Sequence, residues 1–238
     1  MSSVAEKRGS RLPREQRISE ILHTARDVFC ERGYENTAVS EIAARLGVVE
    51  GTIYKYFDSK RELLLTVLAN WYDELFGDFS RELAGIAGAR QRFRYAVWRH
   101  LRTIHDYPQL CRLIFSEVRS QPDYRESELH GMNRRYASLL VNVVQDGIRS
   151  GEFRRGVSLQ LIRDMVFGGV EHHAWSYLYG HGELDVEQLA DQITSALCDG
   201  ILNRRTTDNL SQHTKRLSAI ADRLEQTLDG RKRSRKAS

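Results

Sequence analysis

Hydroxyl, aromatic and cationic side chains follow one another closely between residues 51 and 60. Those that lie off the local apolar stripe are Thr52, Tyr54, Lys55, Tyr56 and Lys60. Such groups suit the phosphates and base edges of nucleic acid, and the helix that starts near residue 60 offers its N-terminus to a phosphate. The pattern predicts a DNA contact. A short helix pair with a glycine turn and no DNA binding is the alternative.

Glu171, His172 and His173 raise the question of a metal site. Consecutive helical positions point about 100° apart, so one helix cannot direct all three onto one ion. Zinc would need further ligands such as His100, His105 or His181, and their spacing does not predict this. We therefore expect no metal, and polar pocket, interface or structural roles for these side chains.

Enzymatic motifs are not found in the sequence. No glycine-rich phosphate loop, HExxH or GxSxG occurs. Cys30, Cys111 and Cys198 lie far apart without a CxxC pair, which indicates reduced thiols. The sequence therefore favours a binding protein without a cofactor over an enzyme. Because the basic N-terminus lacks the apolar segment of a signal peptide, we expect a cytoplasmic protein, and no membrane partner is expected.

Helical periodicity surrounds the candidate DNA contacts. Apolar stripes over residues 18–29 and 39–46 predict two helices. Thr37 is the expected N-cap of the second helix, which Gly47 closes. A third short helix is expected within residues 48–57. This is the layout of a helix-turn-helix, whose recognition helix enters the major groove.

The rest of the chain is also predicted to be helical. Ser59 and Glu62 form a capping box that opens a long helix. Further apolar stripes cover residues 93–104, 110–118, 129–148, 162–174 and 189–201. Prolines are few and stand where helices would stop, and no segment alternates with the period of a strand. We predict an all-α fold of about nine helices.

Positive charge is concentrated at the C-terminal end. Residues 204–238 hold ten Lys or Arg against four Asp or Glu, a net +6, which leaves residues 1–203 at −2. The local pattern, and not the overall charge, therefore indicates DNA binding. Leucines at 210, 217 and 224 predict an extra tail helix. We expect a DNA-binding domain over 14–60, a helical domain over 61–203 and a basic extension over 204–238.

The segment GYENTAVSEIAARLGVVEGTIYKYFDSKRELL resembles the DNA-binding region of TetR/AcrR-type bacterial transcriptional repressors. Matching positions include Gly33-Tyr34, Thr37, Ile42-Ala43, Gly47-Val48, Gly51 to Tyr54, Tyr56-Phe57, Lys60 and Leu63-Leu64. The resemblance is close over residues 14–65, and helix number and length agree over 14–203. It implies a homodimer that places two recognition helices in adjacent major grooves of a palindromic operator.

Carried over by position, the resemblance assigns DNA contacts to Thr37, Ser40, Gly51, Thr52, Tyr54, Lys55, Tyr56 and Lys60. Phosphate contacts are expected mainly of Thr37, Tyr56 and Lys60, and base contacts of Ser40, Thr52 and Lys55. Gly51 admits close backbone approach, and Tyr54 is expected to be partly a packing residue. One position departs from the family: Val49 stands where Ser or Thr commonly caps the recognition helix, and valine offers no hydroxyl.

By the same resemblance, the larger domain binds a small molecule among its middle helices and dimerises through its last two. The candidate pocket residues are Trp71, Trp98, Leu101, His105, Phe115, Tyr136, Leu140 and Val166. The candidate dimer residues are Phe167, Val170, Trp175, Leu178, Leu189, Ile193, Leu197 and Ile201. Burial in the subunit core is the alternative for both sets. Gly168 and Gly169 within a helix are compatible with a close helix crossing.

These inferences predict a sequence-specific DNA-binding transcriptional regulator. The expected activity is repression, with release from a palindromic operator by a small molecule, and the apolar pocket candidates suggest a lipophilic or aromatic effector. The expected partners are double-stranded operator DNA, the effector and a second copy of the chain. The alternative is an all-helical small-molecule-binding protein without DNA binding, against which Tyr56 and Lys60 argue.

Overall fold

A computed structural model describes residues 13–202 together with residues 214, 217, 218 and 220. The described part is helical, and an isolated antiparallel bridge between Phe153 and Leu202 stands in place of a sheet. The predicted all-α fold is therefore confirmed. The expected tail helix, apart from isolated positions, and the basic end of the chain lie outside the described residues.

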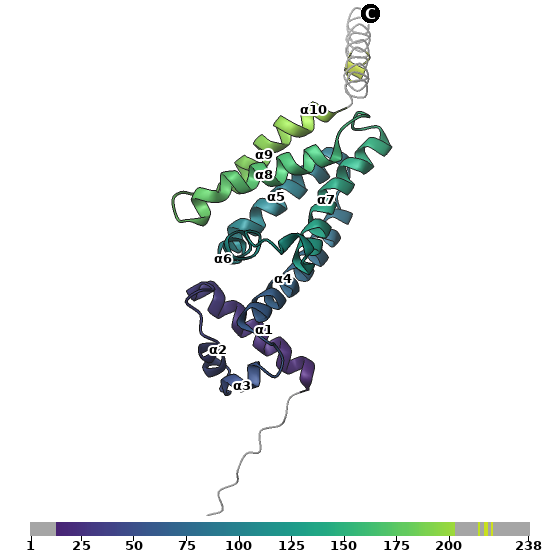
Figure 1. Cartoon of the computed structure of the whole chain (residues 1–238). Coiled ribbons are helices and arrows are strands. Elements are labelled where there is room, and N and C mark those ends of the chain that lie inside the picture. The colour runs from purple at the N-terminus through teal and green to yellow at the C-terminus, as the bar shows by residue number, and fades with distance from the viewer. Residues whose placement is uncertain (1–12, 203–213, 215–216, 219, 221–238) are drawn as a thin grey trace, which may run out of the picture.

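Three short to medium helices form one end of the molecule (Figure 1). They are α1 (Arg14–Arg32), α2 (Val39–Arg45) and α3 (Glu50–Ile53). Gly33 closes α1 with a φ of 77°, and Gly47 makes the turn after α2 with a φ of 66°, conformations that glycine adopts without steric cost. Phe29, Ile42 and Ile53 from the three helices are buried together in their core.

The long helix α4 (Lys60–Ala84) leaves this end and continues into the larger helical bundle (Figure 1). Its start follows the predicted capping box only in part. Ser59 Oγ accepts a hydrogen bond from Glu62 N at 3.0 Å, as expected. The Glu62 carboxylate accepts from the backbone N–H of Asp58 and not from that of Ser59. Both hydrogen bonds of a capping box are therefore formed, but the one accepted by Glu62 comes from the residue before the N-cap.

The larger bundle contains the remaining helices. These are α5 (Ala89–Asp106), α6 (Pro108–Leu113) with a π-turn η1 (Ile114–Val118), the 3₁₀ turn η2 (Tyr124–Glu126), α7 (Glu128–Ser150), α8 (Leu159–Leu178) and α9 (Val186–Ile193) with the π-turn η3 (Thr194–Cys198) and α10 (Asp199–Ile201). Asp185 caps α9 by accepting from Gln188 N at 2.9 Å, as predicted. The last three pieces form one run that corresponds to the predicted ninth helix.

Helix α7 lies among α4, α5 and α8 and organises the bundle. Its Gly147 allows Phe153 to pack directly against the helix backbone. A Cβ at this position would lie 2.3 Å from Phe153 Cδ2. This packing, and the bridge from Phe153 to Leu202, ties the end of α7 to the end of the last helical run. The bundle thereby holds α4 along most of its length.

Candidate DNA-binding surface and ligand cavity

The recognition helix α3 is short and is anchored by apolar side chains behind it. Ile53 and Phe57 are buried in the small domain, which leaves the intervening side chains outside. The N-cap is Val49, which has an extended backbone and forms no side-chain cap, as the sequence indicated. Its side chain is 74% exposed. An apolar group therefore stands free at the end of the helix that faces base edges in a helix-turn-helix.

Most of the predicted DNA contacts lie at the surface of α2, α3 and the following turn. Ser40, Gly51, Tyr54 and Lys55 are exposed, whereas Thr52 and Tyr56 are half-buried. The guanidinium of Arg14 lies 5.6 Å from the centre of the Tyr56 ring. Sequence reasoning missed Arg14, because nothing in its local pattern links it to a side chain so distant along the chain.

Thr37 is inside the domain and not at its surface. It is 3% exposed, and its hydroxyl donates to the carbonyl of Gly33 at 2.7 Å. The N-cap of α2 is Ala38, which offers no side-chain hydrogen bond, so the prediction that Thr37 caps this helix is wrong. The hydroxyl instead joins the turn after α1, because Gly33 presents its carbonyl to it.

Lys60 is held within the protein by the loop between α1 and α2. Its ammonium donates to the carbonyls of Tyr34 at 2.8 Å, Thr37 at 3.0 Å and Glu35 at 3.4 Å. It also lies 4.4 Å from the centre of the Tyr34 ring. An ammonium has three protons, so these carbonyls match its donors. In this structure the side chain fastens the first turn of α4 to the helix-turn-helix.

A cavity of about 980 Å³ opens in the larger bundle. Its walls come from α4, α5, α6 with η1, η2, α7 and α8. Trp71, Phe115 and Tyr136 line it, in agreement with three of the pocket predictions. The other apolar wall residues include Tyr72, Leu75, Ile104, Ile114 and Phe167. Aromatic and aliphatic side chains thus form the apolar part of a cavity whose remaining lining is polar or charged.

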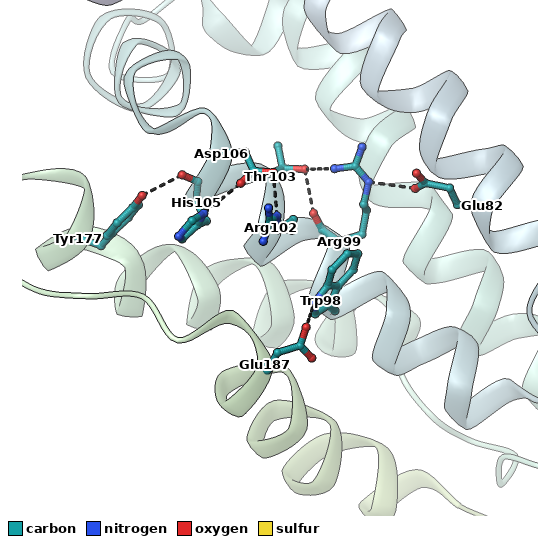
Figure 2. A network of polar contacts seen from close by, with 9 residues as sticks. All are labelled: Glu82, Trp98, Arg99, Arg102, Thr103, His105, Asp106, Tyr177 and Glu187. Carbon is teal, nitrogen blue, oxygen red and sulfur yellow. Dashed lines mark hydrogen bonds and ion pairs between the residues drawn. The ribbon is translucent and has the colours of Figure 1, made fainter.

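The five other pocket candidates do not line this cavity. Leu101, Leu140 and Val166 are buried in the core between helices. Trp98 faces α9, where its Nε1 donates to Glu187 at 2.6 Å, and His105 stacks on Tyr177 with ring centres 5.6 Å apart (Figure 2). Because α5 packs on several neighbours, its apolar stripe points into the core.

The face of α5 that reaches the cavity carries His100, Thr103 and Ile104. Sequence periodicity identifies the buried stripe of a helix but not which neighbour each part of it meets. One face of α5 packs into the helical core through residues such as Leu101, and an adjacent face lines the cavity. This is why the helix was predicted correctly while its cavity residues were not.

Charged side chains surround the apolar part of the cavity. The cavity lining includes Arg119, Arg125, Arg134 and Arg163, with Asp164 and Glu171 beside them. Arg119 and Glu171 pair at 2.6 Å, and Arg163 pairs with Asp164 at 2.7 Å. Within the described residues, Arg125 and Arg134 form no ion pair, and both are exposed. These cations come from four separate elements, so no local pattern could have grouped them.

Polar groups of the cavity interior are neutral near pH 7. Burial lowers the pKa of His100 to about 4, with a smaller contribution from the nearby Arg119 charge. Burial raises the pKa of Tyr136 to about 12. The interior therefore offers uncharged hydrogen-bonding groups, whereas fixed positive charge lies at its rim.

Burial separates the predicted dimer residues into two groups. Val170, Leu178, Leu189 and Ile201 are buried within the subunit. Phe167, Ile193 and Leu197 are partly buried, and Trp175 is exposed. The large apolar side chains exposed on α8 are Leu161, Met165 and Trp175, and the exposed Tyr179 follows as the C-cap residue of this helix. These recur along one side of the helix, so the exposed stripe differs from the one that the sequence suggested.

The Glu171-His172-His173 segment divides between two environments. Glu171 pairs with Arg119 at the cavity, whereas both histidines are exposed. Across residues 13–202, no group of three or more His, Cys, Asp or Glu side chains is arranged to hold a metal ion. Over the same part of the chain, no helix combines the length and apolarity required to cross a bilayer.

Two family descriptions match this chain. Residues 21–67 match bacterial regulatory proteins of the tetR family, and residues 87–201 match the tetracyclin repressor-like C-terminal domain. The first match contains the helix-turn-helix and the start of α4. The second contains nearly all of the helices around the cavity.

Individual relatives agree with this assignment. The fatty acid metabolism regulator protein of Bacillus subtilis is 24% identical over 78% of this chain and 95% of its own length. The transcriptional repressor KstR2 of Rhodococcus jostii is 28% identical over 78% of this chain and 91% of its own length.

A solved structure extends the likeness to the fold. FadR from Bacillus subtilis, crystallised in complex with stearoyl-CoA, superimposes with a TM-score of 0.68 at 25% identity, covering 77% of this chain and 98% of that one. The described helix-turn-helix, the helical bundle and the two family matches lead to one conclusion. This chain is a DNA-binding transcriptional regulator and belongs to the TetR family of bacterial regulatory proteins.

Proposed function

We propose that this chain is a homodimeric repressor that an acyl thioester releases from a palindromic operator. The observation that carries the proposal is the position of α4. Its first residue, Lys60, is bonded to the loop before α2, and its middle residues Trp71, Tyr72 and Leu75 line the cavity. One rigid helix therefore joins the DNA-binding surface to the ligand cavity.

The proposed DNA-binding surface consists of Ser40, Gly51, Thr52, Tyr54, Lys55 and Tyr56. Exposure and position on α2, α3 and the next turn support these residues. Thr37 and Lys60 are proposed to act by holding the loop between α1 and α2, since both are bonded to its carbonyls. Val49 joins the surface as an apolar group that can contact the methyl group of thymine.

A second link between the two ends supports coupling. Arg61, in the first turn of α4, pairs with Asp123 at 3.3 Å. Asp123 directly precedes Tyr124 and Arg125, which line the cavity. A ligand that repositions η2 would therefore act on the start of α4, and a preference for one spacing of the two recognition helices would change operator affinity.

The effector class follows from the two kinds of cavity surface. The apolar part of the cavity suits an acyl group, and the exposed Arg125 and Arg134 suit the phosphates of a coenzyme A head. The stearoyl-CoA bound by the similar FadR structure supports the same class. We propose a long-chain acyl-CoA over a free fatty acid, because the single negative charge of a carboxylate matches only one of the two cations, Arg125 and Arg134, that have no ion pair within the described residues.

A second copy of the chain is the proposed occupant of the exposed stripe on α8. Leu161, Met165, Trp175 and Tyr179 form this stripe, and the rings of the last two stack 5.1 Å apart. Gly168 and Gly169 lie on the same helix, and apart from its own adjacent backbone no described atom lies within 4 Å of where a Cβ would stand. A stripe of this kind allows close approach of a symmetry-related α8.

The experiment begins with selection of bound sequences from random duplex DNA by the full chain. Fluorescence anisotropy then measures affinity for the selected duplex with and without stearoyl-CoA, and sedimentation measures the oligomeric state. We expect a palindromic duplex, a dimer and at least a fivefold loss of affinity with stearoyl-CoA. Absence of any selected sequence would instead favour the helical ligand-binding alternative. Binding that stearoyl-CoA leaves unchanged would contradict the effector class.

A further inference from the structure

Four polar side-chain atoms of residues that line the cavity are buried and have no hydrogen-bond partner among the described residues. They are Nε1 of Trp71, a residue that is 3% exposed, Nδ1 of His100, and the hydroxyl oxygens of Tyr124 and Tyr136. A buried polar atom without a partner costs about 1–3 kcal/mol, so most native proteins satisfy such groups. Four of them around one cavity indicate a missing hydrogen-bonding group.

Another tryptophan of the same bundle has a hydrogen-bond acceptor for its indole N–H. Trp98 Nε1 donates to the Glu187 carboxylate at 2.6 Å. Trp71 instead contacts aromatic rings, with Tyr72 and Tyr107 each at a centre-to-centre distance of 5.7 Å. No protein acceptor stands within reach of its N–H in the described structure. The partner must therefore come from the contents of the cavity.

The surroundings of the Trp71 and His100 nitrogen atoms limit the chemistry of that partner. Trp71, Tyr72, Tyr136 and His100 follow one another in ring contact, with successive centres 5.7, 6.3 and 5.8 Å apart. The Phe167 ring contacts the last two of these rings, with its centre 6.2 Å from that of Tyr136 and 4.6 Å from that of His100. A carboxylate among these rings would lose its hydration, and the cavity arginine whose charge acts on His100, Arg119, is already paired with Glu171 at 2.6 Å. A neutral oxygen does not carry this penalty.

A plain alkyl chain also fails to match this wall, because it would leave both nitrogen atoms unpaired. A keto oxygen accepts from Trp71 Nε1, and a hydroxyl can either donate to or accept from His100, whichever tautomer is present. We propose that the buried part of the effector carries a neutral oxygen function, so that the protein selects keto- or hydroxyacyl thioesters over saturated ones. This inference rests on the proposed acyl thioester cavity.

The test compares matched ligands on the full chain by calorimetry. The probes are stearoyl-CoA and stearoyl-CoA hydroxylated at position 3, 9 or 12. We expect at least one hydroxylated thioester to bind about tenfold tighter than stearoyl-CoA, the factor that one neutral hydrogen bond provides. Equal or tighter binding of stearoyl-CoA against the whole series would overturn the inference and leave the acyl thioester class intact. Absence of binding by every thioester would overturn both.

Matched variants identify the groups responsible. Trp71→Phe removes Nε1 and keeps an aromatic ring, whereas Trp98→Phe makes the same change outside the cavity. We expect the preference to disappear in Trp71→Phe and to persist in Trp98→Phe, with thermal unfolding of both variants as the control for folding. His100→Phe provides a second cavity variant if Trp71→Phe fails to fold. A preference that survives both cavity variants would contradict the inference.

Nuclear magnetic resonance gives a readout that does not depend on affinity. The chain contains three tryptophans, so it has three indole N–H signals, and the Trp71 signal is assigned by its loss in Trp71→Phe. A hydroxylated thioester should move this signal downfield, as expected for a newly formed hydrogen bond, while stearoyl-CoA should not. The Trp98 signal should stay in place with either ligand. A Trp71 signal that responds equally to both ligands would argue against an oxygen partner.

Discussion

The two ends of this molecule encode their functional surfaces in different ways. At the DNA-binding end, the surface comes from a single segment of the chain, residues 40–56, and short-range pattern identifies it. At the cavity end, the wall combines residues from 71 to 171 on six elements. A contiguous motif exposes its chemistry in the sequence, whereas a cavity exists only after distant helices have packed.

The two ends also differ in whether their positively charged side chains are free to contact a ligand. The cations of the cavity rim are available to a ligand, with Arg125 and Arg134 exposed. At the DNA-binding end, the most obvious cation, Lys60, already has three carbonyl partners. A charged residue in a binding motif is thus not by itself a ligand contact, because its role depends on the acceptors that the fold places beside it.

The largest effect is expected from Lys60→Met. Removing hydrogen bonds from a charged donor to the loop carbonyls should destabilise the small domain by about 2 kcal/mol and lower affinity for every DNA sequence by about 30-fold. Since the side chain is engaged within the protein, the salt dependence of DNA binding should stay unchanged. Thermal unfolding and anisotropy titrations at several salt concentrations measure both effects.

Lys55→Met is the matched control for this prediction. Lys55 is exposed at the recognition helix, so its loss should leave thermal unfolding unchanged and reduce the salt slope by about one. If Lys60→Met instead reduced the slope and spared stability, Lys60 would be a phosphate contact. The pair thus tests whether charge at this end serves DNA or the fold.

The next effect concerns pH and the cavity end. The pKa of His100 is about 4 in the folded protein and near 6.5 when unfolded, because burial disfavours the charged ring. The unfolded chain therefore binds more protons between these values, and stability falls as the pH is lowered from 6.5 towards 4. Between pH 7.5 and pH 5 the loss from this group is about 2 kcal/mol.

Urea unfolding of the wild type and of His100→Gln at both pH values isolates this contribution. The variant should lose less stability than the wild type on acidification, by about the amount stated above. His105→Gln is the control, since His105 is only half-buried and is stacked on Tyr177 outside the cavity. An equal loss in all three proteins would show that His100 titrates normally.

The sequence predicted the fold better than the sites. Several helix ends could be predicted from the sequence because local chemistry determines them, as with Gly33, Ser59 and Asp185. Most residues of the proposed DNA-binding surface could be named from the sequence for a similar reason, since they lie in one contiguous segment. The sequence did not predict which neighbour each face of α5 and α8 contacts. Trp98 and Val170 are of residue types common in pockets and interfaces, but Trp98 bonds to Glu187, far along the chain, and Val170 is buried within the subunit.

A smaller effect is expected at the start of the recognition helix. Val49→Thr keeps a β-branched side chain and adds a hydroxyl that can accept from the backbone N–H of Gly51, since the N–H of Thr52 already donates to the Val49 carbonyl at 2.8 Å; the change should stabilise the small domain by about 1 kcal/mol. Thermal unfolding and hydrogen exchange of α3 measure this gain. Val49→Ala should give no gain. If threonine also gave none, the terminal turn would not be limited by its missing cap.

The smallest effect on stability and the most specific one on regulation are expected from Asp123→Asn. Its ion pair with Arg61 is solvent-exposed, so the variant should lose about 0.5 kcal/mol or less. If η2 transmits ligand binding to α4, the variant should show about a threefold smaller effect of stearoyl-CoA on operator affinity. By linkage, operator DNA must then change stearoyl-CoA affinity by the same reduced factor.

Asp73→Asn is the matched control for this last prediction. Asp73 pairs with Arg135 at the same distance of 3.3 Å and is likewise exposed, but this pair joins α4 to α7 and does not reach the first turn of α4. Both variants should therefore have similar stability, and only Asp123→Asn should lose coupling. Equal coupling in the two variants would mean that the ligand acts on the DNA-binding end through the body of α4, with η2 serving only as cavity wall.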